Sequence, residues 1–450
     1  MSISLDQLKS RALEAFHAGL DQVRPERLVL EALMLEPPFK GQFDLRELVE
    51  SEEPVHVFSC GKAAARMAEA ATHVLSARLA RTLCIVPDGT ARPAALGTQS
   101  VQWIESGHPL PSDRSAAAGL AAFDWMAALP AEGASLLVLL SGGTSALLGM
   151  PRTGFSVSDL AVATRLLLES GARINEINTV RKHLCPPLGG GLLKASPSGI
   201  QIIVLLISDV PGNDLTTIGS GPFIPDPTTV ADARSILDRY QLGGRLPEDI
   251  KKLFFNQTPP DDLETLKPGD GRITPTHLVL ADSHTLLKAI ESQFRDARYS
   301  TIIGENEQDT VSAAVESHLE AVERLRREIP EGLVILLSGG ELSVKVAGTG
   351  SGGRNTHYAL EFLVRTGADR LRTGPWVLLS AGSDGRDGLS TAAGALVDSR
   401  SYELARQRGL DPAAFLARFD SYSFFADTGG LVTTGATGSN LNDVRMVILG

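Results

Sequence analysis

The chain contains five short apolar runs, and each is followed by a turn or loop rich in glycine or small polar residues. The runs cover residues 55–58, 136–140, 202–207, 333–337 and 376–379. Continuous rather than alternating apolarity is typical of strands that are buried on both faces, as in a parallel sheet covered by helices. Alanine- and leucine-rich segments with helical spacing lie between the runs. The pattern therefore predicts an α/β fold throughout.

The same pattern predicts how the chain is divided. Residues 224–275 have the least strand character and are rich in proline and aspartate, which indicates a boundary. We expect an α/β domain over residues 1–225, a connecting segment over 226–274 and a smaller α/β domain over 275–439. The tail, residues 440–450, is expected to return as a strand to the sheet of the first domain.

Two strand-to-loop segments echo each other across this boundary, LLVLLSGGTSALL at 136–148 and LVILLSGGELSVKV at 333–346. Ligands of open α/β sheets bind beyond the carboxyl ends of strands, and clefts between domains are favoured sites. The echo favours two glycine loops that face one crevice. Coincidence between two common strand-end turns is the alternative.

Composition and charge narrow the class of function. The chain has 450 residues, 43% apolar and 21% charged, as in an ordinary globular protein of about two or three domains. A net charge of −11 without a long basic run argues against nucleic acid as a partner. The apolar runs are far shorter than the ~20 residues that span a bilayer, and the first residues fit an amphipathic helix better than a signal peptide. We expect a cytoplasmic protein that binds a small molecule, with self-association left open.

Several catalytic classes lack their motifs. The three cysteines show no CxxC spacing, so neither a disulfide framework nor a zinc cluster is signalled. The absence of HExxH and GxSxG disfavours zinc hydrolases and serine esterases. We interpret the histidines near motifs, His108, His183 and His357, as structural.

A first candidate anion site lies in HVFSCGKAAARM, where Gly61 turns the chain and Lys62 begins an alanine-rich helix. The free N–H groups of a helix N-terminus and the ammonium of Lys62 would both attract a phosphate or a carboxylate. A solvated lysine after a tight turn is the alternative. No GxxxxGK[ST] motif occurs, so this is not a Walker loop.

A second candidate is SGGTSALL at 141–148. Gly142 and Gly143 allow a ligand to approach the backbone, and Thr144 and Ser145 offer hydroxyl groups. Glycines and hydroxyls suit phosphate oxygens, although a structural strand-to-helix turn would look the same. The echo at 338–340 ends at Glu341, which could contact a metal, a ribose or the substrate.

Acidic residues follow two of the predicted strands. Asp209 stands directly after the most apolar run, and Asp384 and Asp387 follow the run that ends at Leu379. Carboxylates at strand ends often hold Mg²⁺. Turn formation or helix capping is the alternative.

The segment GTGSGGRNTHYALEFL at 348–363 formally contains GxGxxG. A dinucleotide site would require an acidic residue about 20 positions later, and only Asp369 is near that place. Arg354, directly after Gly353 and before a predicted helix, places a permanent charge at a candidate anion-binding turn. We interpret this loop as phosphate or carboxylate recognition. Near the chain end, Asn442 lies between a Gly/Thr loop and the last apolar run.

These segments together resemble the type-2 glycerate kinase family, whose C-terminal part is called the MOFRL domain. The resemblance spans nearly the whole chain and rests on motifs in family order: GKAAARM, GHPLPSDRS, LSGGTSALL, NTVRKHL, SDVPGNDLTTIGSGP, SGGE, GGRN, SAGSDGRDG and TGATGSNLNDV. It implies a Rossmann-like larger lobe, a smaller α/β lobe and an active site between them. It also implies ATP- and Mg²⁺-dependent phosphorylation of D-glycerate at its 2-hydroxyl, with Lys62 and Arg354 at positions taken as catalytic.

On this resemblance we predict a role for each candidate. Lys62 and Arg354 would neutralise the transferred phosphoryl group, and Asp387 would accept the hydroxyl proton. Asp209 and Asp384 would hold Mg²⁺. Contacts to ATP phosphates or to the substrate are predicted for Gly61, Ser141, Gly142, Gly143, Thr144, Ser145, Arg181, Lys182, Ser338, Gly339, Gly340, Glu341, Gly353, Asn355 and Asn442.

The chain departs from the family pattern in two places. After GGRN the family usually continues Gln-Glu, whereas this chain has Thr356 and His357, so a carboxylate is lost. After VRKHL a Lys-Gly-Gly-Arg stretch is expected, but Leu188 and three glycines stand there. If those cations touch phosphate, nucleotide binding is weaker or depends on Arg181 and Lys182. A subgroup that acts on another small 2-hydroxy acid is therefore an open alternative.

Two other functions stay open. A hydroxypyruvate reductase would use the GxGxxG at 348–353 for a nicotinamide cofactor, but the acidic ribose partner is missing. A non-catalytic metabolite-binding protein would agree with the departures at His357 and Leu188.

Overall fold

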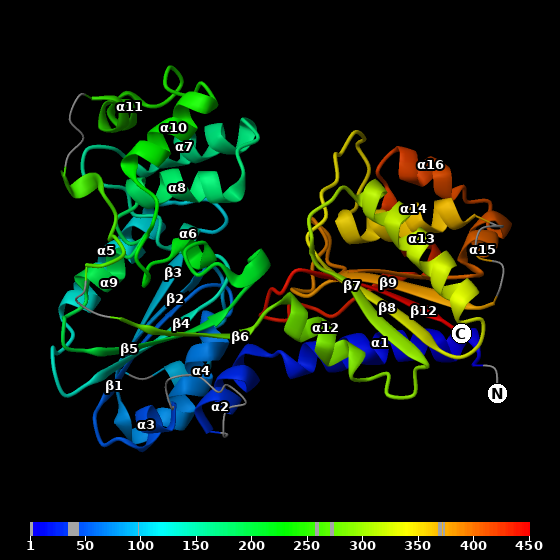
Figure 1. Cartoon of the computed structure of the whole chain (residues 1–450), viewed down its shortest axis with the longest axis horizontal. Coiled ribbons are helices and arrows are strands. Elements are labelled where there is room, and N and C mark those ends of the chain that lie inside the picture. Colours follow the sequence, from blue (N-terminus) through cyan, green and yellow to red (C-terminus); the bar gives the residue numbers. More distant parts are fainter. Residues whose placement is uncertain are drawn as a thin grey trace. The chain divides into compact units, whose positions relative to one another are not determined.

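The computed structural model describes residues 3–34, 45–97, 99–256, 261–270, 274–367, 371 and 374–450. The chain forms two compact units. We call Pro25–Leu280 the parallel-sheet unit, and Met1–Arg24 together with Ala281–Gly450 the mixed-sheet unit. Each unit contains one six-stranded sheet (Figure 1). Among the described residues, no helix is long and apolar enough to cross a membrane.

The sheet of the parallel-sheet unit has the strand order β3-β2-β1-β4-β5-β6, which is that of a doubly wound dinucleotide-binding fold. Its first five strands pair in parallel. Strands β1 and β4 are buried along their whole length, as their continuous apolarity predicts. The strands are β1 (Val55–Cys60), β2 (Leu79–Pro87), β3 (Val101–Ser106), β4 (Ser135–Leu140), β5 (Gln201–Ile207) and β6 (Thr276–Ala281).

Helices cover both faces of this sheet. Figure 1 shows α2, α3 and α4 on one face and α5 and α7 to α10 on the other. Ala64 and Ala68 of α4 pack against Cys84 of β2, while Phe58 and Trp125 belong to the larger core on the opposite face. The helices are α2 (Pro25–Met34), α3 (Leu45–Glu50), α4 (Ala64–Leu75), α5 (Asp113–Ala127), α6 (Thr144–Leu147), α7 (Val157–Glu169), α8 (Ile174–Leu184), α9 (Gly191–Ala195), α10 (Val230–Arg239) and α11 (Glu248–Phe255).

The sheet of the mixed-sheet unit has the order β11-β10-β9-β12-β8-β7. Only β7 and β8 pair in parallel among its described pairs, and β12 lies antiparallel between β9 and β8. Figure 1 shows α1 and α12 on one face and α13 and α14 on the other. The elements are α1 (Leu5–Gln22), α12 (Ser283–Glu291), β7 (Tyr299–Glu307), α13 (Val311–Glu328), β8 (Val334–Gly340), α14 (Arg354–Thr366), β9 (Trp376–Gly382), β10 (Gly394–Asp398), α15 (Ser401–Gln407), α16 (Pro412–Ala417), α17 (Ser421–Thr428), β11 (Leu431–Val432) and β12 (Asp443–Leu449).

The α/β prediction is confirmed, and the five apolar runs form β1, β4, β5, β8 and β9. The division of the chain differs from the expected one. The last strand, β12, lies in the second sheet rather than the first, because its seven buried residues need a neighbour on each side and find them in β8 and β9. A local pattern shows that a strand is buried but does not show in which sheet.

The ends of the expected first domain and the connecting segment also differ. Helix α1 belongs to the mixed-sheet unit, where Gly19 lies so close to α12 that a Cβ there would stand 2.4 Å from Ile290 Cγ1. Strand β6 extends the first sheet. Residues 226–274 are not a linker in their described part, because Leu237, Phe254 and Leu263 enter the core of the parallel-sheet unit.

Candidate active site

In the parallel-sheet unit, the turns after β1 and β4 pack directly on each other. Gly61 has φ +130°, and a Cβ there would stand 2.2 Å from Ser141 Oγ. The Lys62 N–H donates to the carbonyl oxygen of Gly142 (2.9 Å), and the Ala63 N–H donates to Ser141 Oγ (3.0 Å). The first two sequence motifs are therefore one structural feature.

The two glycines after Ser141 bring three functional side chains close together. A Cβ on Gly142 would stand 2.4 Å from Asp209 Oδ2. A Cβ on Gly143 would stand 3.0 Å from His108 Cδ2 and 3.4 Å from Lys62 Cγ. The glycine turn thus lies between a cation, a carboxylate and an imidazole, at the carboxyl ends of β1, β4 and β5.

His108 is a residue of this site that the sequence analysis treated as structural. Burial, with the nearby charge of Lys62, lowers the pKa of His108 to about 4. The imidazole is therefore neutral at neutral pH, and one ring nitrogen can accept a hydrogen bond. The motif GHPLP, directly after β3, was the signal that could have identified it.

The two hydroxyl residues of this loop have internal partners. Thr144 Oγ1 is within 2.9 Å of the carbonyl oxygens of Cys60 and Ser141, and Thr144 is fully buried. Ser145 Oγ and Ser220 Oγ lie 2.8 Å apart, and Ser220 donates to Asn178 Oδ1 (3.3 Å). The phosphate contact predicted for Thr144 thus conflicts with its role in joining β1 to β4, whereas Ser145 connects the loop to the segment after β5.

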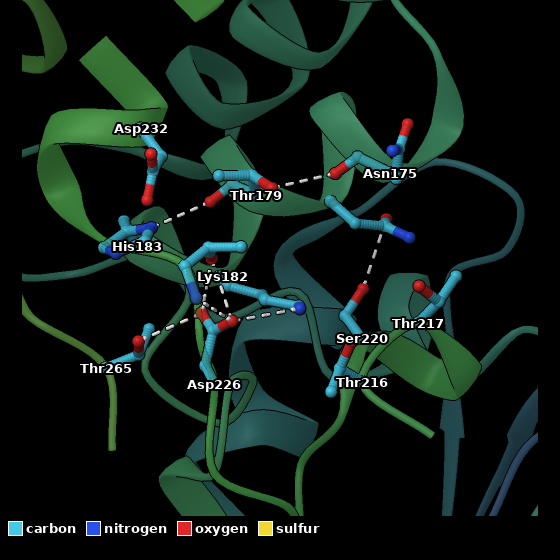
Figure 2. A network of polar contacts seen from close by, with 12 residues as sticks. Asn175, Thr179, Lys182, His183, Thr216, Thr217, Ser220, Asp226, Asp232 and Thr265 are labelled. Atoms are coloured by element: carbon cyan, nitrogen blue, oxygen red, sulfur yellow. Dashed lines mark hydrogen bonds and ion pairs between the residues drawn. The ribbon is translucent and has the colours of Figure 1, made fainter. Parts of the chain in front are cut away.

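Lys182 is fixed by an internal ion pair. Figure 2 shows it pointing at Asp226, and its Nζ lies 3.3 Å from Asp226 Oδ1. Both residues are buried, and Thr228 and Thr265 also donate to the same carboxylate. Burial alone would raise the pKa of Asp226, but Lys182 and the threonine donors lower it. The predicted phosphate contact of Lys182 is therefore not supported: its charge is matched inside the unit.

Arg181, the neighbour of Lys182, is the other cation that the sequence assigned to phosphate. Its Nε is buried and has no hydrogen-bond partner among the described residues. Burial lowers the pKa of the Arg181 guanidinium. The phosphate contact of Arg181 stays a prediction.

In the mixed-sheet unit, Arg354 is the first residue of α14 and is held by two carboxylates. Its Nε and Nη2 donate to Asp443 Oδ2 (2.5 Å) and Oδ1 (3.2 Å), and its Nη1 donates to Glu341 Oε1. Burial alone would lower the pKa of Arg354, but Asp443 and Glu341 raise it. The structure thus gives Asp443, to which the sequence assigned no role, a direct contact with the predicted catalytic arginine.

Asp387 caps helix α14, the helix that begins at Arg354. Its carboxylate accepts the N–H groups of Asn355 (2.8 Å) and Thr356 (2.8 Å) and the hydroxyl of Thr356 (2.7 Å). Burial raises the pKa of Asp387, and these hydrogen bonds offset only part of that rise. These three hydrogen bonds give Asp387 a structural role as the cap of α14, and its role as proton acceptor stays a prediction.

Asp384, the other predicted metal ligand, lies near Asp443. A Cβ on Gly382 would stand 3.2 Å from Asp384 Oδ1 and 3.4 Å from Asp443 Oδ1, and the Arg386 N–H donates to Asp384 (3.0 Å). In the part of the chain that the structure describes, no three His, Cys, Asp or Glu side chains form a metal-binding group. The two predicted ligands, Asp209 and Asp384, lie in different units.

The second SGG segment differs from the first, because residues 338–340 form the end of strand β8. A Cβ on Gly339 would stand 2.4 Å from Ser283 Oγ, and one on Gly340 would stand 2.1 Å from the Glu307 nitrogen. Both glycines are thus required by packing inside the unit, and the phosphate contacts predicted for them find no open space on that side. Ser338 accepts a hydrogen bond from Arg445, and Glu341 binds Arg354.

The glycines of GxGxxG are also occupied by packing. Gly348 lies against the backbone of Arg418, Gly350 against Phe419, and Gly353 against Asp387, where a Cβ would stand 2.3 Å from Oδ1. The loop therefore does not present three glycines to a pyrophosphate. Asp369, its only candidate ribose partner, lies outside the described residues.

The two remaining amides support this region. Asn355 is buried and accepts the Ser380 hydroxyl (2.8 Å), while its Nδ2 has no hydrogen-bond partner within the described residues. Asn442 has φ +65°, and its carbonyl oxygen accepts the Ser383 N–H (3.0 Å). Asn442 thus shapes the turn that leads into Asp443.

Both departures from the family pattern have structural roles. Thr356 closes the α14 cap, and His357 stacks on Phe419 with ring centroids 4.7 Å apart. Leu188 is buried, and the glycines that follow donate backbone hydrogen bonds to Ser220 and Gly221 (2.9 and 2.7 Å). The changed residues therefore have packing roles, each inside its own unit.

The chain matches two families: a domain of unknown function, DUF4147, over residues 11–255, and the MOFRL family over residues 334–443. Glycerate 2-kinase of Pyrococcus horikoshii is 32% identical, over 94% of this chain and 96% of that protein. D-glycerate 2-kinase of Thermotoga maritima is 31% identical over 98% of both. A putative hydroxypyruvate reductase of Agrobacterium vitis is 36% identical, over 88% of this chain and 87% of that protein.

A solved structure also supports membership of the glycerate kinase family. The crystal structure of a glycerate kinase from Thermotoga maritima has a TM-score of 0.84 at 29% identity and covers 99% of this chain and 100% of that one. Fold and sequence define a phosphotransferase enzyme. The chain belongs to the glycerate kinase family, as its motifs indicated.

Proposed function

We propose that this chain phosphorylates D-glycerate at its 2-hydroxyl, with ATP and Mg²⁺, in the cytoplasm. The observation that carries the proposal is the convergence of Lys62, the glycines at 142 and 143 and Asp209. A cation, a turn without side chains and a carboxylate are what the phosphates of a nucleotide and their metal require. The cytoplasm suits three cysteines that are all free and buried.

The residues present fit Mg²⁺. This ion needs only one or two carboxylates, because water and phosphate oxygens supply its other ligands. Asp209 offers such a carboxylate beside Gly142 in the parallel-sheet unit, and Asp384, in the mixed-sheet unit, stays a predicted ligand. When bound, Mg²⁺ would neutralise phosphate charge.

Lys62 and Arg354 are proposed to stabilise the phosphoryl group as it is transferred. The transition state of this reaction spreads negative charge over the phosphoryl oxygens, so positioning and fixed cations supply most of the catalysis. Among the described residues, the hydrogen bonds of Arg354 use three of its five N–H groups, which leaves donors for a ligand. Little base catalysis is needed, so the capping role of Asp387 does not conflict with the proposal.

The test measures ADP formation from ATP and Mg²⁺ with D-glycerate, and phosphorus NMR identifies the product. We expect 2-phosphoglycerate; phosphorylation at another position, or at another hydroxy acid only, would overturn the stated specificity. Lys62→Ala should lower kcat by about 100-fold, as when other electrostatic stabilisers are lost. Arg66→Ala removes an exposed cation from α4, the helix that follows Lys62, and is the matched control. Equal rates for the two variants would overturn the role of Lys62.

A second candidate function is reduction of hydroxypyruvate, which the Agrobacterium vitis relative's name suggests. The packed glycines at 348, 350 and 353 argue against a nicotinamide site there. Loss of NADH absorbance on addition of hydroxypyruvate, without ATP, would favour this candidate over the kinase.

A further inference from the structure

We propose that Arg445 is a positioning residue for phosphoryl transfer: its guanidinium holds residues 338–340, at the end of strand β8, and thereby sets the positions of Glu341 and Arg354. The inference rests on the proposed function, because Arg354 is the group through which Arg445 acts. Arg445 itself touches neither substrate nor nucleotide in this account.

Three successive residues at the end of β8 bind the same guanidinium. Arg445 lies on β12 and is 2% exposed. Its Nε donates to Ser338 Oγ (2.9 Å), its Nη2 to the carbonyl oxygen of Gly339 (2.7 Å) and its Nη1 to that of Gly340 (3.2 Å). A planar fork with several donors can hold such a set at once, whereas an ammonium cannot.

The end of β8 needs this support because its pairing with β7 is irregular there. The pairing of β7 with β8 shifts register between Ile302 and Gly304 and again between Gly304 and Glu307. Backbone carbonyls that are buried must find donors. Arg445 supplies them at Gly339 and Gly340, in the stretch where the ladder is irregular.

A partly buried ion pair fixes the guanidinium of Arg445. Arg445 Nη2 lies 3.0 Å from Glu307 Oε2, and His318 Nε2 lies 2.9 Å from Glu307 Oε1. Burial alone would raise the pKa of Glu307, but His318 and Arg445 lower it. His318 Nδ1 also lies 2.5 Å from the Tyr358 hydroxyl, and Tyr358 stands one turn after Arg354 on α14.

Arg445 therefore connects to Arg354 by three routes. The end of β8 leads to Glu341, strand β12 carries Asp443 two residues before Arg445, and the Glu307 and His318 contacts reach α14. Glu341 and Asp443 are the residues that hold the Arg354 side chain. Because a displacement of about 1 Å can cost ~100-fold in rate, a shift of this scaffold would slow the reaction through Arg354.

The experiment compares Arg445→Lys with Arg326→Lys. Arg326 also lies in the mixed-sheet unit, and its guanidinium donates to two carbonyl oxygens, of Gly450 (2.7 Å) and Pro375 (3.0 Å), beyond the other end of β12. We expect Arg445→Lys to lower kcat about 10-fold or more with little change in the KM for ATP, and Arg326→Lys to leave kcat near wild type. Equal losses of kcat in the two variants would overturn the proposal.

Coupling to Arg354 gives a second readout. In an Arg354→Lys background, Arg445→Lys should add only a small further loss, because the group it positions is already changed. A full multiplicative loss would show that Arg445 acts independently of Arg354, and would overturn the inference. If Arg445→Lys does not fold, Glu307→Gln, which removes the charge that fixes Arg445, takes its place with the same expectation.

An NMR measurement separates this inference from the proposed function. In protein labelled with ¹⁵N-arginine, the Nε–H signal of Arg354, assigned by its loss in Arg354→Lys, should shift in Arg445→Lys and not in Arg326→Lys. An unchanged signal would overturn the positioning role whether or not the protein is a kinase. Wild type that transfers no phosphoryl group would overturn the proposed function, while a shifted Arg354 signal in Arg445→Lys would still show that Arg445 positions Arg354.

Discussion

Gly142 lies against the carboxylate of Asp209, so closely that a Cβ atom on the glycine would stand 2.4 Å from Asp209 Oδ2. The two residues follow β4 and β5, which are parallel neighbours, so the sheet itself brings them together. The missing side chain at position 142 is therefore a requirement of this approach and not only a property of the turn.

Gly142→Ala is expected to displace the Asp209 carboxylate. The φ angle of Gly142 is not in the left-handed region, so the effect arises from the contact and not from backbone strain. We expect kcat/KM to fall by about 10-fold or more, with a higher Mg²⁺ concentration at half-maximal rate. Gly244→Ala is the control, since a Cβ there meets nothing within 4 Å. Unchanged Mg²⁺ dependence in Gly142→Ala would argue against Asp209 as a metal ligand.

His108 should make the stability of the protein depend on pH. Its pKa is about 4 in the folded protein, mainly because of burial, against 6.5 for an ordinary histidine. Between these values the unfolded chain binds a proton that the folded chain does not. The stabilising effect is therefore complete above pH 6.5 and is lost as the pH falls towards 4.

Urea unfolding at pH 7.5 and at pH 5.0 tests this dependence. From pH 7.5 to 5.0, wild type should lose about 1–2 kcal/mol more free energy of unfolding than His108→Gln. Identical losses in the two proteins would mean that His108 is accessible to protons in the folded state.

Asp387→Asn tests whether the cap on α14 serves stability, chemistry or both. An amide cannot accept hydrogen bonds at both ends, so one donor of Asn355 or Thr356 loses its partner. We expect a loss of about 1–3 kcal/mol in the free energy of unfolding, together with a lower kcat because Arg354 begins the same helix. Asp282→Asn, at the cap of α12, is the control that should lose stability only. A fall in kcat without any loss of stability would support the prediction that Asp387 accepts the hydroxyl proton.

Lys182→Met separates a structural lysine from a phosphate ligand. The variant leaves Asp226 buried without its cation, and breaking such a pair costs about 3–5 kcal/mol. We expect this loss in urea unfolding and an unchanged KM for ATP in the protein that folds. The double variant with Asp226→Asn should lose less than the sum of the single losses. A stable Lys182→Met protein with a raised KM for ATP would contradict the assignment.

The sequence predicted the strands and turns better than the contacts between side chains that are distant in the chain. The glycine turn after β4, the position of Lys62 before α4 and the strand before Asp209 follow from short segments, because local apolarity and turn residues determine them. Lys182 and Asp387 have buried partners that the sequence did not reveal, for one reason. A charged residue in a motif has the same local pattern whether it faces a ligand or a buried partner, and Asp226 lies 44 residues from Lys182 in the chain.

By itself, the sequence determined the α/β class, the five buried strands, the glycine turns and the glycerate kinase family, because periodicity and ordered motifs are local properties. Only the tertiary structure decided that β12 lies between β8 and β9, that Asp443 binds Arg354 across 89 residues and that Arg445 binds the glycine-containing end of β8. The physical reason is that sheet order and buried ion pairs depend on which distant segments share a core. No short pattern of residues contains that information.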